Sequence, residues 1–267
     1  MSDNRITRVF AELNARGEKA LIPFVTAGYP DLETTAELVL GMARAGADVI
    51  ELGVPFSDPL ADGPTIQRAS QAALSGGINL RQIVALVARL REQTAVPLVL
   101  MSYFNPILSY GLEAFVSEAS RAGVDGLIVP DLPVEEADPL LELGDARGLA
   151  LIPLVAPTST PERITRIAAK ARGFVYCVSL TGVTGRHGGF SKKLAEVIGN
   201  VRAQTGLPLA IGFGIAEPGQ VRELAPYADA LIVGSAIVNR ISAAGENGAV
   251  KAVQNLVTEL KQALVKK

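Results

Sequence analysis

Short, almost continuously apolar segments alternate along the chain with longer segments in which apolar residues recur at helical spacing. The short segments have about five to seven residues each, which is typical of parallel strands covered on both faces. They are Ala20–Thr26, Ala47–Leu52, Pro97–Ser102, Gly126–Pro130, Leu149–Val155, Phe174–Ser179, Pro208–Gly212 and Ala230–Gly234. The pattern therefore predicts eight buried parallel strands.

The segments between these strands carry the start signals of helices. Asn79 followed by Gln82 has the spacing of a capping box, and Thr160-Pro161 places a capping residue before a proline in the first turn. A short amphipathic helix is expected within residues 1–10, and another from Val250 to Leu264. Strands that alternate with helices in this way predict an α/β fold.

A similar phrase precedes three of the strands, as Ala45-Gly-Ala-Asp-Val-Ile, Ala122-Gly-Val-Asp-Gly-Leu and Tyr227-Ala-Asp-Ala-Leu-Ile. Repeated βα units of this kind favour a single (β/α)8 TIM barrel, with extra helices at the N-terminus and after strand eight. No linker or charge block divides the chain, so we expect one domain over residues 1–267. An open, doubly wound sheet is the alternative, because closure cannot be read from one sequence.

Composition narrows the class of protein. The chain has 267 residues, of which 49% are hydrophobic and 19% charged, so it can bury a large core. Its net charge of -2 is spread without a basic face, which argues against nucleic-acid binding. Cys177 is the single cysteine, and neither a membrane span nor a signal peptide is found. We therefore expect a cytoplasmic protein.

Two carboxylates are candidates for catalysis, because the active site of a barrel lies at the C-terminal ends of its strands. Glu51 lies inside an apolar strand near that end, where partial desolvation favours the neutral acid and proton transfer near neutral pH. The alternative is a buried acid satisfied by backbone donors. Asp62 ends the loop after the same strand and presents either a second carboxylate or the N-cap of the helix that follows.

Glycines after the last strands suggest a phosphate site. Gly214 and Gly234 would let backbone amides approach an anion, and Ser235 would open a short helix whose N-terminus favours negative charge. Tyr176 either points toward substrate or packs in the core. No lysine occurs between Lys19 and Lys170, which disfavours a Schiff base, and a single histidine and a single cysteine cannot build a histidine-rich zinc site.

The segment Ile50-Glu-Leu-Gly-Val-Pro-Phe-Ser-Asp-Pro-Leu-Ala-Asp-Gly63 resembles the signature of the tryptophan synthase alpha subunit family. Further landmarks agree in order: Pro23-Phe-Val-Thr-Ala-Gly-Tyr-Pro30, Pro130-Asp-Leu-Pro-Val-Glu-Glu136, Thr181-Gly-Val-Thr-Gly185, Gly212-Phe-Gly-Ile215 and Gly234-Ser-Ala-Ile237. The resemblance implies a lyase that cleaves indole-3-glycerol phosphate to indole and D-glyceraldehyde 3-phosphate without a cofactor of its own.

The same resemblance implies a role for individual residues. Glu51 matches the catalytic glutamate that moves protons between the glycerol hydroxyl and indole C3, and Asp62 matches the aspartate that accepts the indole N–H. The positions that match substrate contacts are Phe24, Tyr176 and the lid residue Thr184, and those that match phosphate contacts are Gly185, Gly214, Gly234 and Ser235.

The resemblance further implies a partner, a beta subunit that carries pyridoxal phosphate and receives indole through a tunnel in a heterotetramer of two alpha and two beta subunits. The positions that match this interface are Pro55, Asp58, Asn105 and Pro133. Leu180 stands where some members have arginine in the lid. Three alternatives are a stand-alone indole-releasing lyase, another phosphate-binding barrel, and a catalytically silent partner protein. The signature segment Ile50–Gly63 disfavours another phosphate-binding barrel, and the intact Glu51 and Asp62 disfavour a catalytically silent protein.

Overall fold

The computed structural model describes residues 4–178, 192–212, 214–245 and 248–265. Within them, nine parallel strands form one sheet in the order β5-β4-β3-β2-β1-β9-β8-β7-β6. The strands are β1 (Ala20–Thr26), β2 (Ile50–Gly53), β3 (Leu98–Met101), β4 (Gly126–Ile128), β5 (Ala150–Ile152), β6 (Leu154–Val155), β7 (Val175–Val178), β8 (Leu209–Gly212) and β9 (Ala230–Val233). Each falls within or beside one of the predicted strands.

The two ends of this sheet, β5 and β6, follow each other in the chain and are joined by Pro153. Proline has no N–H to donate, so the predicted strand Leu149–Val155 is divided there. β5 pairs with β4 and β6 pairs with β7, while the Pro153 carbonyl accepts a hydrogen bond of 3.0 Å from the Tyr176 N–H. The sheet therefore closes through Pro153, which confirms the predicted barrel and excludes the open sheet.

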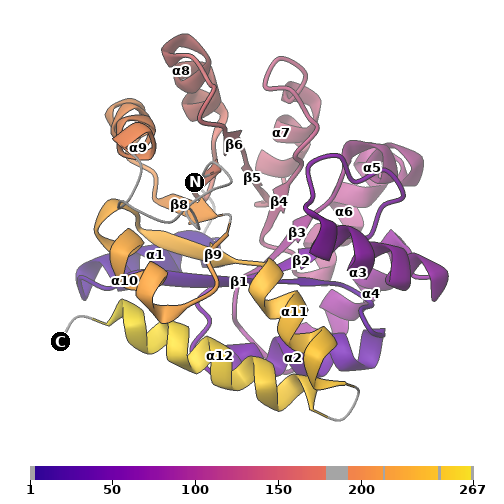
Figure 1. The fold of residues 1–267 in the computed structure, drawn as a ribbon. Helices are drawn as coiled ribbons and strands as arrows, with labels where there is room; N and C mark the ends of the chain where they lie inside the picture. The colour runs from indigo at the N-terminus through magenta and orange to yellow at the C-terminus, as the bar shows by residue number, and fades with distance from the viewer. Residues whose placement is uncertain (1–3, 179–191, 213, 246–247, 266–267) are drawn as a thin grey trace.

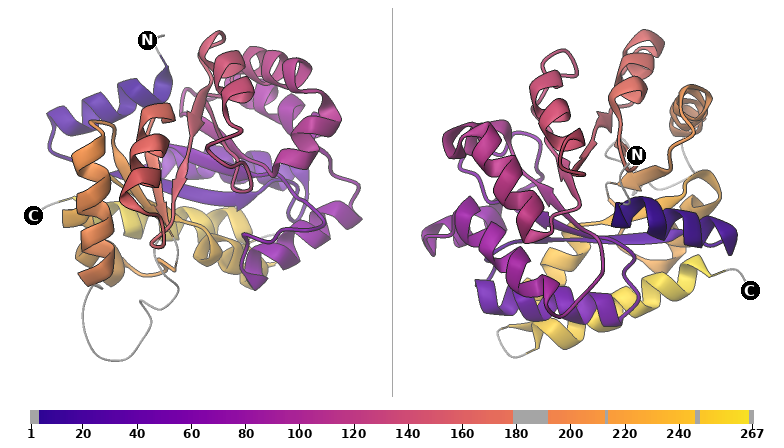
Figure 2. Two further views of the ribbon diagram at one scale, coloured as in Figure 1. Left: turned by 90° about the horizontal axis from the view of Figure 1, so that it is seen from above. Right: turned by 180° about the vertical axis from the view of Figure 1, so that it is seen from behind.

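Helices surround the barrel, and α1 and the pair α11–α12 are the predicted additions to the repeated units (Figures 1 and 2). The helices are α1 (Arg5–Ala15), α2 (Leu32–Arg44), α3 (Pro64–Ser75), α4 (Leu80–Arg91), α5 (Phe104–Tyr110), α6 (Leu112–Ala122), α7 (Asp138–Asp145), α8 (Pro161–Lys170), α9 (Lys192–Gln204), α10 (Pro218–Leu224), α11 (Ser235–Ala244) and α12 (Ala249–Leu264), with a 3-10 turn at Ala225–Tyr227.

Side-chain caps mark the starts of α1, α4 and α8, two of them at the predicted residues. Asn79 and Gln82 form the expected reciprocal capping box at α4, and the Thr160 hydroxyl caps α8 by accepting from the Arg163 N–H. The N-terminal helix begins later than the range 1–10 suggests, because Asn4 is its cap and accepts from the Ile6 N–H at 2.8 Å. The capping predictions for α4 and α8 are confirmed.

The barrel interior is filled by every second residue of the strands. Ala20 and Ile22 of β1 pack there with inward residues of the other strands, and the apolar face of α1 covers the N-terminal end of this cluster with Ile6, Phe10 and Leu13. The residues between them, such as Leu21, face outward and pack under the helices. Interior side chains at the opposite end of the strands are therefore the ones available for a site.

The repeated phrase has a structural role at the N-terminal end of the barrel. Its aspartates, Asp48, Asp125 and Asp229, each accept a hydrogen bond of 2.7 to 2.9 Å from the first free N–H of the preceding neighbouring strand. Each aspartate is also paired with at least one basic side chain. The equivalent backbone position before β7 is Arg172, whose N–H donates to the Leu151 carbonyl at 2.9 Å. The aspartates of the repeated phrase therefore fix the register of neighbouring strands and take no part in catalysis.

Candidate active site

Phe24 and Glu51 lie opposite each other on neighbouring strands, near the C-terminal end of the barrel. The Phe24 ring covers Gly53, where an added Cβ would lie 2.4 Å from Phe24 Cζ. Val238 of α11 and Ile66 of α3 pack against the same ring. Gly53 is thus required to leave room for Phe24, which forms an apolar wall beside Glu51.

Glu51 is buried, with 1% of its surface exposed, and its Oε2 atom has no hydrogen-bond partner. Burial, and to a smaller extent the nearby charge of Asp62, raises the pKa of Glu51 from 4.5 to about 8. The alternative of a buried acid fully satisfied by backbone donors does not hold for this oxygen. An acid with this pKa holds a proton at neutral pH and can release it to a reacting group.

Asp62 lies in the loop between β2 and α3 and interacts electrostatically with Glu51. Burial raises the pKa of Asp62 from 3.8 to about 6, while a hydrogen bond with the Tyr103 side chain acts to lower it. The N-cap of α3 is Gly63, so the interpretation of Asp62 as the capping residue is wrong. The two carboxyls therefore differ in pKa, with Asp62 the more acidic and ionised at neutral pH.

Tyr103 is a site residue that the sequence interpretation missed. It follows β3 directly, its hydroxyl accepts a hydrogen bond of 2.9 Å from the Ala61 N–H, and it bonds to the Asp62 carboxyl. Its ring stacks on Phe56 with centroids 5.1 Å apart. The signal was its place at the end of a predicted strand, where barrel residues reach the site. Tyr103 holds the Asp62 loop against the barrel.

Replacing Tyr103 with phenylalanine should raise the pKa of Asp62 above about 6, because the variant loses the hydrogen bond that lowers it. Less Asp62 is then ionised at a given pH, so the acid limb of kcat/KM should move to higher pH. The measurement is a pH profile of indole release between about pH 5 and 9. Tyr110→Phe is the matched control, since that hydroxyl bonds to Glu118. An unmoved acid limb would contradict the assignment.

Tyr176 lies on β7 and faces the interior, where it packs with the inward cluster. An added Cβ at Gly212 would lie 2.2 Å from the Tyr176 hydroxyl oxygen, so the hydroxyl rests directly over this glycine. Burial raises the pKa of Tyr176, and the charges of Glu51 and Asp62 raise it further. The structure therefore brings the Tyr176 hydroxyl into the electrostatic field of the two carboxyls.

Three of the four residues predicted to contact phosphate lie in the described part of the chain, namely Gly214, Gly234 and Ser235. Gly234 is the N-cap of α11, which begins at Ser235 as predicted. Gly214 is exposed and has a φ of +76°, a conformation that glycine adopts without strain. Gly185 and the predicted lid residue Thr184 lie outside the described residues. Gly234 and Ser235 form a helix N-terminus that is suited to an anion.

The residues predicted to contact a partner follow the C-terminal ends of three strands. Asp58, Asn105 and Pro133 are exposed, whereas Pro55 is buried within the chain itself. Leu60, in the same loop as Asp58, has 94% of its surface exposed. The surface around the site mouth thus combines exposed polar residues with a protruding apolar side chain.

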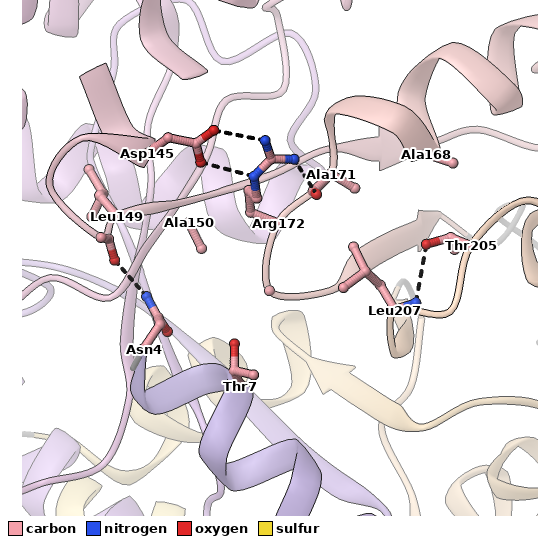
Figure 3. A pocket seen from close by; sticks show the side chains of 12 residues that line it. Asn4, Thr7, Asp145, Leu149, Ala150, Ala168, Ala171, Arg172, Thr205 and Leu207 are labelled. Carbon is pink, nitrogen blue, oxygen red and sulfur yellow. Dashed lines mark hydrogen bonds and ion pairs between the residues drawn. The ribbon is translucent and has the colours of Figure 1, made fainter. Parts of the chain in front are cut away.

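Two cavities lie at opposite ends of the barrel. One of about 380 Å³ opens at the C-terminal end, where Leu154 and Val178 line it together with Ala61, the neighbour of Asp62. The other, of about 650 Å³, lies at the N-terminal end, and Figure 3 shows the Arg172 guanidinium facing the Asp145 carboxylate at its edge. The carboxyl pair belongs to the first end, so the larger cavity is separate from it.

The described residues contain neither a metal-binding cluster nor a membrane-spanning helix. No group of histidine, cysteine, aspartate and glutamate in that part of the chain has an arrangement that could hold a metal ion. None of the helices described there combines the length and apolarity needed to cross a membrane.

The tryptophan synthase alpha chain family model matches residues 10–265. A tryptophan synthase alpha chain from Caldanaerobacter subterraneus is 50% identical over 263 residues, which cover 98% of this chain and 100% of the relative. One from Synechocystis is 49% identical over 262 residues, covering 98% and 99%. The crystal structure of tryptophan synthase subunit alpha from Legionella pneumophila superposes with a TM-score of 0.92 at 38% identity, covering 98% of this chain and 99% of that one. The chain therefore belongs to the tryptophan synthase alpha chain family.

Proposed function

We propose that Glu51 and Asp62 carry out the reaction of this family in the present chain. That reaction is the cleavage of indole-3-glycerol phosphate to indole and D-glyceraldehyde 3-phosphate, and a member of the family is a carbon–carbon lyase. The observation that carries the assignment is the pair of carboxyls with separated pKa values, about 8 for Glu51 and about 6 for Asp62. Such a separation assigns different roles to two neighbouring acids.

Protonated Glu51 donates its proton to indole C3, which places positive charge on the ring nitrogen. Ionised Asp62 accepts the indole N–H and stabilises that charge. Glu51, now a carboxylate, removes the proton from the hydroxyl on the carbon attached to the ring. The bond between that carbon and C3 then breaks, its electron pair restores the aromatic indole, and the hydroxyl carbon becomes the aldehyde. One carboxyl thus acts first as acid and then as base.

The remaining substrate contacts follow from the family resemblance and the positions already described. The phosphate would bind at Gly185, Gly214, Gly234 and Ser235, where α11 presents its N-terminus. Phe24 and Tyr176 would form walls of the substrate pocket, and Thr184 would close it. The 380 Å³ cavity that Ala61 lines lies at the same end of the barrel, although neither Glu51 nor Phe24 is among its lining residues.

Replacing Gly234 with aspartate should weaken binding of glycerol phosphate by about tenfold or more, because a carboxylate at the α11 N-terminus repels the phosphate. The measurement is a titration of each purified variant with glycerol phosphate. Gly199→Asp is the charge-matched control, since that helical position is open and an added Cβ meets nothing within 4 Å. Equal affinity in the two variants would refute this phosphate site.

We further infer that the chain works as one domain over residues 1–267 in the cytoplasm, without a cofactor of its own. The protonated indole ring serves as the electron sink, so the cleavage itself needs no pyridoxal phosphate. That cofactor belongs to the proposed partner, a beta subunit joined in a heterotetramer of two alpha and two beta chains. Solved structures of Mycobacterium tuberculosis tryptophan synthase match this chain with a TM-score of 0.88 in the aminoacrylate-bound form. Pro55, Asp58, Asn105 and Pro133 are the proposed contacts.

The function is tested by measuring indole release from indole-3-glycerol phosphate, with and without a tryptophan synthase beta subunit. We expect slow release by the chain alone and a strong increase when the partner is added, since docking on the rim would favour the closed site. Fast release that the partner leaves unchanged would identify a stand-alone lyase. Absence of release under both conditions would refute the proposed reaction.

A further inference from the structure

Two buried side-chain oxygens in the described part of the chain lack a hydrogen-bond partner, Glu51 Oε2 and Thr26 Oγ1. Thr26 has 1% of its surface exposed. Buried polar groups in folded proteins nearly always have a partner, and an exception calls for an explanation, such as a role in catalysis or the binding of a water, an ion or another ligand. The proposed reaction explains the free oxygen of Glu51, but no contact among the described residues satisfies the hydroxyl of Thr26.

The strand register places both oxygens on the same surface. Thr26 is two residues beyond Phe24 on β1, so the two side chains share the interior face of the barrel. Phe24 pairs with Glu51 and Thr26 pairs with Gly53, which puts Thr26 one row closer to the C-terminal end than Glu51. Strand spacing gives about 8 Å between the two Cα atoms, a gap that their side chains and one small ligand can bridge.

One polar group of the substrate is left without an assigned contact, and this step rests on the proposed function. The phosphate is assigned to Gly234 and its neighbours, the ring N–H to Asp62, and the reacting hydroxyl to Glu51. The second glycerol hydroxyl, on the next carbon of the chain, remains. Vicinal hydroxyls lie close together, so a ligand that presents one to Glu51 presents the other within the same layer of the barrel.

We propose that Thr26 is a substrate-binding residue whose hydroxyl bonds to this second glycerol hydroxyl. The bond holds the glycerol chain so that its first hydroxyl faces Glu51. A threonine hydroxyl both donates and accepts, so it can complete a bond to an alcohol in either direction. Thr26 would thereby distinguish substrates that carry the hydroxyl from analogues that lack it.

Thr35 provides an internal comparison, because it is a second fully buried threonine whose hydroxyl is satisfied. It accepts from the Gly28 N–H at 2.9 Å and donates to the Asp31 carbonyl at 2.7 Å. Replacing Thr35 with valine removes two bonds of the fold and should lower the midpoint of urea unfolding. Replacing Thr26 with valine removes no bond of the fold, so its midpoint should equal or exceed that of the original protein.

The test measures dissociation constants for indole-3-glycerol phosphate and for indole-3-propanol phosphate, which lacks both hydroxyls. Both ligands are titrated into Glu51→Gln protein, so that substrate is not consumed, with Thr26 intact or changed to valine or serine. We expect Thr26→Val to weaken binding of the hydroxylated ligand about tenfold and that of the propanol analogue less than about twofold. Thr26→Ser, which keeps the hydroxyl, should restore most of the affinity.

Equal weakening for both ligands, or none for either, would overturn the role of Thr26. A lowered unfolding midpoint for Thr26→Val would also overturn it, since the hydroxyl would then be serving the fold. Turnover of indole-3-glycerol phosphate by the unmodified chain is measured in parallel. If the unmodified chain turns over substrate but Thr26→Val affects both ligands equally, only the role of Thr26 is rejected. If the unmodified chain shows no turnover, the proposed function is rejected.

Discussion

Glutamine in place of Glu51 should lower kcat for indole release by about 10³-fold or more, because the substitution removes the group that both donates and accepts the proton. Glutamine has nearly the shape of glutamate, and the site around it is buried, so the variant should still bind indole-3-glycerol phosphate. The measurement combines steady-state release of indole with ligand titration. A loss of turnover with retained binding separates a chemical role from a structural one.

Glu37→Gln is the matched control for this experiment, since Glu37 is exposed on α2 and makes the same change of charge far from the site. It should keep the turnover of the original protein. If Glu51→Gln retained more than about a tenth of the original kcat, proton transfer by Glu51 would not limit the reaction.

Glu51 should also make the fold less stable as pH rises. Below pH 4.5 both the folded and the unfolded chain hold its proton. Between 4.5 and about 8 the unfolded chain releases the proton while the folded chain keeps it, so stability falls with rising pH and then levels off. Raising the pKa from 4.5 to about 8 lowers the free energy of unfolding above that range by about 5 kcal/mol, at about 1.4 kcal/mol per pKa unit.

Glu51→Gln removes this titration, so the variant should gain stability over the original protein as the pH increases. Urea unfolding at about pH 5 and about pH 8 measures the difference, with Glu37→Gln as the reference for an exposed acid. We expect the free energies of unfolding of the two variants to differ by several kcal/mol at the higher pH and by little at the lower pH. Parallel stability curves for the two variants would show that burial does not raise the pKa of Glu51.

The apolar pattern predicted the barrel because each strand is buried on both faces and therefore reads as an unbroken apolar run. The predicted β1, Ala20–Thr26, has the same bounds in the structure. The predicted second strand begins at Ala47, whereas β2 begins at Ile50, because Asp48 bonds to Leu21 before the ladder starts. Periodicity records burial, but it does not record which backbone groups a side chain engages.

The candidate site was predictable where its chemistry depends on one position in one strand. Burial of Glu51 follows from Ile50 and Leu52 on either side of it. The contact of Tyr103 with Asp62 joins two segments far apart in the chain, and no local pattern encodes that pairing. The same holds for Thr26, whose free hydroxyl is recognisable only when all of its neighbours are known.

The apolar face of α1 determines the end of the barrel at which substrate can enter and products can leave. Ile6, Phe10 and Leu13 pack over the N-terminal end of the filled barrel interior in the described structure, so Glu51 is approached from the C-terminal end of the strands. Substrate must therefore enter, and both products must leave, at the C-terminal end of the barrel. A partner protein docked at that end, as proposed above, would receive indole as it leaves the site, but it must leave glyceraldehyde 3-phosphate a path to water.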